Sequence, residues 1–439
     1  MSNAARGRAE SDKRGAIRLE SWTVVNEPGK VMDVDAVLVA AARALDSGNL
    51  LEALKRVSLR EDAPALGLRG VIFARMGQFA RARELLAKAA RAFGPSVPLG
   101  RARCLLADAE IALATRDLRG VDAALGEARR LLAAERDLVN AAHATCLAAR
   151  SALLRGQIQD AERLLGGLET KHLPPLIAIE LELARTEAYR RKPAAASAQK
   201  ALQRAERWAS AARITIFSRE IAAQKALLAA PAASALSRGH ARSLTLTELE
   251  TLLTDASSML VDARELAVRG NGTRVELGRR PVLFALVRAL AEAWPEPAAR
   301  ARLIAQAFGA KRVNESHRAR LRVELARLRR ALGSLASIAA TREGFALTPL
   351  GGRAVTLLTS PQESEHEPVL ALLRDGEAWA SSALSVALGK SQRSVQRVLG
   401  ELEVSGQVRS AGRARAKRFF CAPPEIATPL LLPVPDEIA

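Results

Sequence analysis

The spacing of leucine and polar residues between positions 316 and 332 predicts an amphipathic α-helix. Leu321, Leu325, Leu328 and Leu332 recur at intervals of three or four residues. At 100° per residue these leucines fall within about 60° of one another, which is the width of a stripe that packs on a core. The opposite side of the helix carries Ser316, Arg320, Arg327 and Arg330. The stretch therefore predicts one buried face and one basic face.

The residues around this helix predict strands and two further helices. Valine and leucine alternate with polar residues before Pro281, and Asn271-Gly272 is typical of a β-hairpin turn. Pro281 suits the first turn of a helix, residues 297–308 predict a second one, and Asn314 suits the N-cap of the basic helix. Two short strands are expected after it. The predicted order is a sheet, three helices and a hairpin.

Residues 257–348 resemble the winged-helix effector domain of OmpR-type transcriptional regulators. The resemblance rests on the leucine stripe with Val323 and Arg329, and on the stretch 340–347. It implies a DNA-binding domain whose third helix enters the major groove, where arginine bonds phosphates or pairs with guanine. The residues expected at DNA are Ser316, Arg318, Arg320, Arg322, Arg327, Arg330 and Arg342. The alternative is that this basic face is only solvated. Arg322 and Arg329, near the flanks of the leucine stripe, would then serve packing or backbone contacts. Glu324 argues against DNA, because its negative charge would lie close to a phosphate.

Residues 366–422 again predict three helices followed by a hairpin, with a different sequence. Three helices, a Gly412 turn and a basic hairpin are expected, with Ser391 as an N-cap and Val395, Leu399 and Leu402 facing inward. This region resembles the winged helices of MarR-like regulators, which implies a second DNA-binding domain. The residues expected at DNA are Ser391, Gln392, Arg393, Gln396, Arg397, Arg413, Arg415, Lys417 and Arg418. A winged helix that binds protein is the alternative.

Residues 33–230 predict helical hairpins. The segment 68–95 resembles a tetratricopeptide repeat, in which small residues let two antiparallel helices approach and large ones fill the groove left by the preceding repeat. The residues that carry the resemblance are Gly70, Phe73, Gly77, Phe79, Ala82, Leu86, Ala89 and Pro95. Weaker copies place Asp117 and Gly156 where Gly77 stands, and a fourth hairpin is expected across Lys192-Pro193. The implied role is a protein-binding or dimerisation scaffold, and a generic helical bundle is the alternative.

The predicted fold is mainly α, with a tetratricopeptide-like solenoid followed by two winged helices with small β-hairpins. The flanking segments are expected to be an N-terminal arm at 1–32, linkers at 231–256 and 349–365, and a proline-rich tail at 423–439.

Composition narrows the class of function. The chain of 439 residues has a formal net charge of +19 and only 3% aromatic residues, which favours a helical protein with a polyanionic partner. Cys104, Cys146 and Cys421 are far apart, so we expect free buried thiols and no metal site or cofactor. His143 and His172 are isolated and are expected on a helix surface or in a loop. Without a secretory leader or membrane span, a cytoplasmic protein is expected.

These observations favour a sequence-specific DNA-binding transcription regulator of bacterial type, whose repeats act as a sensor or interaction module. Double-stranded DNA is the expected partner. The helical repeats are expected to bind a protein or a second copy of the chain. No binding to a membrane is expected. The alternative is a protein adaptor. RNA is disfavoured because few aromatic residues offer stacking, and an enzyme is not expected because no nucleophile, base or nucleotide loop is brought together by the motifs.

Overall fold

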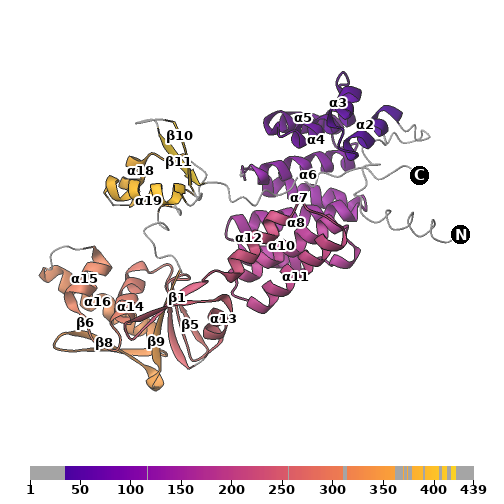
Figure 1. Ribbon diagram of the computed structural model, residues 1–439. Helices are drawn as coiled ribbons and strands as arrows, with labels where there is room; N and C mark the ends of the chain where they lie inside the picture. The colour runs from indigo at the N-terminus through magenta and orange to yellow at the C-terminus, as the bar shows by residue number, and fades with distance from the viewer. Residues whose placement is uncertain are drawn as a thin grey trace. The chain divides into compact units, whose positions relative to one another are not determined.

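The computed structural model describes residues 35–115, 117–255, 257–309, 314–360, 369, 373, 378–388, 391–404, 408–412 and 417–421. The described chain is mainly helical with small sheets, as the sequence predicts (Figure 1). It divides into two compact units, one at 35–192 with 196–225 and one at 193–195 with 226–421. No helix in the described ranges combines the length and the apolar character needed to cross a membrane.

The first unit is a succession of helices joined by short turns, and from α2 to α10 each helix packs on the next one (Figure 1). The helices are α2 (Ala36–Asp46), α3 (Leu50–Val57), α4 (Ala63–Arg75), α5 (Phe79–Phe93), α6 (Pro98–Ala114), α7 (Val121–Ala134), α8 (Leu138–Leu154), α9 (Ile158–Gly166), the 3-10 helix η3 (Thr170–His172), α10 (Pro175–Arg191), α11 (Ala195–Ala211) and α12 (Ser218–Ala229).

Small and large residues interlock between α4 and α5. A Cβ atom added to Gly70 would lie 2.8 Å from Leu86 Cγ, so only glycine allows this approach. Ala82, Leu86 and Ala89 are fully buried. The predicted role of the small positions, which is to let one helix of the hairpin approach the other, is therefore confirmed at Gly70.

A shared backbone hydrogen bond defines the register of successive hairpins. In each, an amide near the start of the second helix donates to a carbonyl near the end of the first: Asn49 to Ala44, Gln78 to Phe73, Asp117 to Ala112 and Gln157 to Ala152. Asp117 thus corresponds to Gln78, and the prediction that it takes the place of Gly77 is wrong by one residue. The glycine of this turn, Gly120, stands directly before α7 and not at the position of Gly77, so it did not mark the register.

The second unit begins where a linker was expected. Residues 231–256 contain β1 (Ala233–Ser237), β2 (His240–Leu244) and α13 (Leu246–Thr254), and the second expected linker contains the 3-10 helix η4 (Leu350–Gly352) and β9 (Ala354–Thr359). Both linker predictions are wrong here, because β1 pairs with β9 across more than a hundred residues, with Leu236 opposite Leu357. Local composition does not show such a partner.

These strands complete a six-stranded sheet. Its order is β2-β1-β9-β3-β4-β5, with β3 (Ser258–Asp262), β4 (Ala267–Gly270) and β5 (Thr273–Glu276). β3 and β9 run parallel, and the other neighbours are antiparallel. The predicted turn at Asn271-Gly272 joins β4 to β5, and both residues have positive φ.

Three helices and a second sheet follow. The helices are α14 (Pro281–Ala293), α15 (Arg300–Phe308) and α16 (Glu315–Leu332), and the sheet has the order β6-β8-β7, with β6 (Ala298–Ala299), β7 (Ala336–Ala340) and β8 (Gly344–Pro349). The four leucines of α16 share one buried cluster with α14, α15 and both sheets. The predicted helices, their order and the closing hairpin are confirmed.

The C-terminal described segments form a small separate core. They are α18 (Ser381–Leu388), α19 (Gln392–Val404), β10 (Val408–Ala411) and β11 (Arg418–Cys421). Val395, Leu399 and Leu402 are buried as predicted, together with Phe419. The helix predicted before α18 lies outside the described residues except for Val369 and Leu373, which are buried.

Candidate nucleic-acid interface

The basic helix α16 begins at a side-chain cap. Asn314 has extended backbone angles, and its Oδ1 accepts a hydrogen bond of 2.8 Å from the His317 amide. This satisfies one of the amides that a helix leaves without an intrahelical acceptor at its N-terminus. The His317 ring also stacks on Phe308 of α15 with 6.4 Å between ring centroids. The predicted N-cap is confirmed, and it fixes the start of α16 beside α15.

The two faces of α16 differ as the leucine spacing predicts. Leu321, Leu325, Leu328 and Leu332 are buried, and the side opposite them is exposed. Val323 lies at the centre of this exposed side with 52% of its surface accessible. The outward face of α16 is defined as Ser316, Arg320, Val323, Arg327 and Arg330, all exposed.

Three of the predicted DNA-binding arginines on α16 have acidic partners. Arg318 Nη1 and Arg322 Nη2 lie 3.3 and 3.1 Å from the two carboxylate oxygens of Glu315. Arg327 Nη1 lies 2.8 Å from Glu324 Oε1. The two pairs with Glu315 are exposed, so each stabilises the helix by less than about 1 kcal/mol and can exchange for a phosphate. Glu324 is only 13% exposed, and its charge offsets that of Arg327.

The other three arginines of α16 have no acidic partner among the described residues and differ in what they contact. Arg329 Nε donates to the Ile338 carbonyl at 2.8 Å, so this side chain joins α16 to the hairpin, as the packing alternative predicts. The Arg320 guanidinium stands 4.5 Å from the Phe308 ring centroid. Arg330 is exposed, and the described residues include no acidic partner for it. Arg320 and Arg330 are therefore the most available cations of the outward face.

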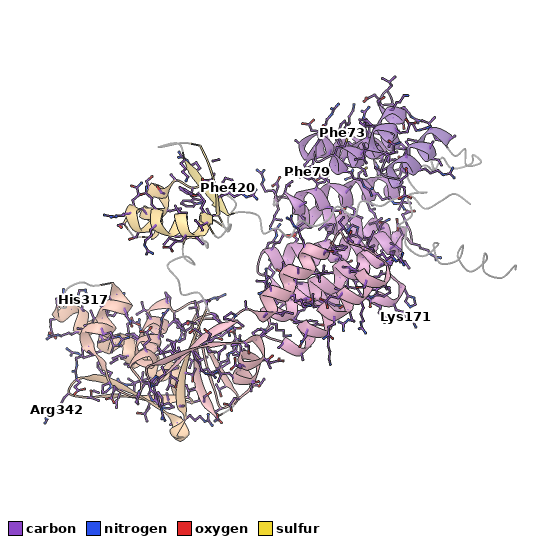
Figure 2. All side chains as sticks on the ribbon, viewed as in Figure 1. Phe73, Phe79, Lys171, His317, Arg342 and Phe420 are labelled. Atoms are coloured by element: carbon purple, nitrogen blue, oxygen red, sulfur yellow. The ribbon has the colours of Figure 1, made fainter. Side chains whose placement is uncertain are left out.

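The hairpin β7-β8 is held by an arginine that sequence reasoning did not single out. Arg300 donates to the carbonyl oxygens of Arg342 and Thr341 at 2.8 and 2.6 Å, and its guanidinium stands 5.5 Å from the Phe345 centroid. The Arg342 side chain is exposed and points away from the turn (Figure 2). Among 66 basic residues, nothing local to Arg300 indicates this role.

A basic groove runs beside the outward face of α16. It has a volume of about 630 Å³ and is lined by Arg280, Pro281, Val282, Leu283, Glu324, Arg327, Arg330 and Ala331. Arg327 and Arg330 are among the residues predicted from the sequence to contact DNA, and Arg280 is not. The pair Arg279-Arg280 directly before the helix-starting Pro281 was the available signal.

The second predicted interface is α19. Ser391 Oγ accepts a hydrogen bond of 3.1 Å from the Ser394 amide, which confirms the predicted N-cap. Gln392 Nε2 donates to Ser381 Oγ at 3.1 Å and so fixes α19 against α18. Arg393 and Gln396 are exposed, and Arg397 is exposed in an ion pair of 2.9 Å with Glu401.

The hairpin after α19 is described in part. Lys417 Nζ lies 3.2 Å from Glu403 Oε2 and 4.8 Å from the Phe419 centroid, so this predicted DNA contact serves packing as well. Arg418 is exposed. Arg413 and Arg415 lie outside the described residues.

Two further predictions concern histidine and cysteine. His172 is exposed in η3, as expected, but His143 is fully buried in α8 and its predicted surface position is wrong. Helices distant in sequence cover it. Cys104 and Cys146 are free and buried, as predicted.

Within the ranges given above, no three His, Cys, Asp or Glu side chains gather where a metal ion would bind. The chain matched no protein-family model, no curated protein and no solved structure in comparisons with each of these sets.

Proposed function

We propose that this chain is a sequence-specific DNA-binding transcription regulator. The observation that carries the proposal is the outward face of α16, where three exposed arginines and an exposed valine stand opposite four buried leucines. An α-helix fits the major groove of B-DNA, where arginine pairs with guanine and an apolar side chain contacts the methyl group of thymine. The order of three helices and a hairpin supports an OmpR-type winged helix.

The segment with α19 is proposed as a second DNA-binding domain of the MarR-like kind. Arg393 and Gln396 are exposed on the side away from the buried stripe, and exposed Arg418 follows on the return strand. Two domains on one chain raise the effective concentration of each at a neighbouring half-site. The helical hairpins of the first unit are proposed as a tetratricopeptide-like solenoid that acts as a sensor or binds a protein partner.

The test is selection of genomic DNA fragments by the purified full chain at about 150 mM salt, a concentration at which nonspecific binding is weak. We expect one enriched sequence motif. The variants Arg320→Glu and Arg393→Glu should lose its retention, and Lys171→Glu, a matched charge reversal on exposed η3 (Figure 2), should retain it. Retention without a motif, or equal retention by all variants, would contradict the proposal.

One observation favours an adaptor instead. Glu315 and Glu324 pair with three of the arginines on α16, which lowers the net charge of this surface. An adaptor would capture the same cellular proteins after Arg320→Glu and Arg393→Glu and would retain no DNA. Pull-down of proteins and DNA with the same variants therefore separates the two functions.

A further inference from the structure

The basic groove lies between the first turn of α14 and the C-terminal half of α16. Its polar lining consists of Arg280, Glu324, Arg327 and Arg330, and its apolar lining comes from Pro281 to Leu283 and Ala331. Three cations thus share about 630 Å³ with one acid. Like charges gathered at one groove favour an anion over any cationic or neutral ligand.

The cations of the groove are not equally available. Glu324 has a side chain that is only 13% exposed and pairs with Arg327 at 2.8 Å. Arg280 and Arg330 are exposed, and neither has an acidic partner among the described residues. Arg280 and Arg330 therefore supply the free charge of the groove, and Glu324 offsets the charge of Arg327.

The groove continues the outward face of α16, because Arg327 and Arg330 belong to both. Ser316 and Arg330 are fourteen residues apart, which is about 21 Å along a helix that rises 1.5 Å per residue. The major groove of B-DNA is only about 12 Å wide. When the N-terminal half of α16 lies over base edges, its C-terminal half therefore lies over the phosphate backbone.

We propose that the basic groove binds backbone phosphates of the DNA duplex, with Arg280 and Arg330 as phosphate contacts and Glu324 as a residue that weakens them. The inference rests on the proposed function and adds Arg280 and Glu324 to the interface. Phosphate contacts position a protein on DNA but do not distinguish sequences. The basic groove therefore contributes to the affinity for DNA and to the salt dependence of that affinity. The preference for one DNA sequence comes from other residues of α16.

The test compares the chain of 439 residues with its single variants by fluorescence anisotropy on the selected DNA site and on a scrambled duplex. Arg280→Gln and Arg330→Gln should each weaken binding to both duplexes by the same factor. Each should also make the slope of log affinity against log salt shallower by about 0.9. Because of this difference in slope, the ratio of variant to wild-type affinity should rise roughly 3.5-fold when the salt concentration is raised from about 50 to 200 mM. Lys171→Gln is the matched control and should change neither quantity.

Glu324→Gln gives the sharper result, because a gain in binding is not produced by misfolding. Removing this acid frees Arg327, so we expect tighter binding to both duplexes and a slope steeper by about 0.9. Unchanged or weaker binding by Glu324→Gln overturns the inference, as does an altered sequence motif for Arg330→Gln. If the wild-type protein binds DNA and the Arg280 and Arg330 variants match it, the groove inference fails alone. If the wild-type protein binds no DNA, the proposed function fails.

Discussion

Replacing Arg150 with methionine should destabilise the first unit strongly. Arg150 extends from α8 and is nearly inaccessible to solvent. Its Nη2 lies 2.6 Å from Glu220 Oε1 on α12, and its Nη1 lies 3.4 Å from Glu180 Oε1 on α10. One guanidinium therefore joins three helices and neutralises two carboxylates that water does not reach.

The size of the effect follows from the two carboxylates left behind. Removing one partner of a buried ionic group costs about 3–5 kcal/mol, because the remaining charge is buried without compensation. Burial raises the pKa of Glu180 to about 7 even beside Arg150, and it also raises the pKa of Glu220. The full cost should appear at about pH 8, above the pKa of Glu180, where this carboxylate is ionised in the wild-type protein.

The loss should be smaller at about pH 5.5. A carboxyl group whose pKa is higher in the folded than in the unfolded protein binds its proton more tightly in the folded state. It therefore stabilises the fold at a pH below its unfolded-state pKa, and this stabilisation is lost as the pH rises through its folded-state pKa. For Glu180 this window runs from its ordinary value of 4.5 to about 7, and removal of Arg150 extends it upward. Burial and the nearby charge of Arg150 lower the pKa of His143 to about 3, which gives the opposite slope. The part of this shift that comes from Arg150 is absent from the variant, and its loss also makes the variant's deficit smaller at low pH.

The assay is urea unfolding of the full chain at the two pH values, with hydrogen exchange of α8, α10 and α12 identifying the transition of this unit. The triple variant with Glu180→Gln and Glu220→Gln added to Arg150→Met should recover most of the lost free energy at about pH 8. A loss below about 1 kcal/mol, or an equal loss at both pH values, would refute the buried ionic group.

Two predictions test how the α16 domain is held together. Gly344→Ala should separate β6 from β8, because the added Cβ would lie 1.9 Å from the Ala298 carbonyl oxygen. We expect faster amide hydrogen exchange at β6 in this variant. The matched Gly278→Ala meets open space and should leave exchange unchanged. Asn314→Ala should cost about 1 kcal/mol of unfolding free energy by loss of the N-cap, and Asn314→Asp should preserve it; equal urea midpoints for both variants would contradict this.

The sequence predicted those parts of the fold that depend on neighbours within a few turns of chain. The leucine spacing of α16, its Asn314 cap and the Asn271-Gly272 turn are local, and all three are present. The strands β1 and β9 were missed because neither has a strong alternating pattern, and each becomes a strand by pairing with a distant segment. His143 was misplaced for the same reason, since its burial depends on α10 as well as on its own helix.

The candidate interface shows a different limit of sequence reasoning. The sequence reveals six arginines between 316 and 332, but it does not reveal what each one contacts. In the structure Arg318 and Arg322 share Glu315, and Arg329 bonds to the hairpin, while Arg280 joins Arg330 from another helix.

The net charge of +19 therefore overstates the charge available to DNA at this domain. Among the described residues of the outward face, the basic groove and the β7-β8 turn, the available cations are Arg280, Arg320, Arg327, Arg330 and Arg342, and Glu324 offsets one of them. About four phosphate contacts from these described residues contribute a salt slope near −3.6, well below what a count of the domain's arginines suggests. A much steeper slope for the full chain would mean that the α19 domain, with its own exposed Arg393, supplies the remaining contacts.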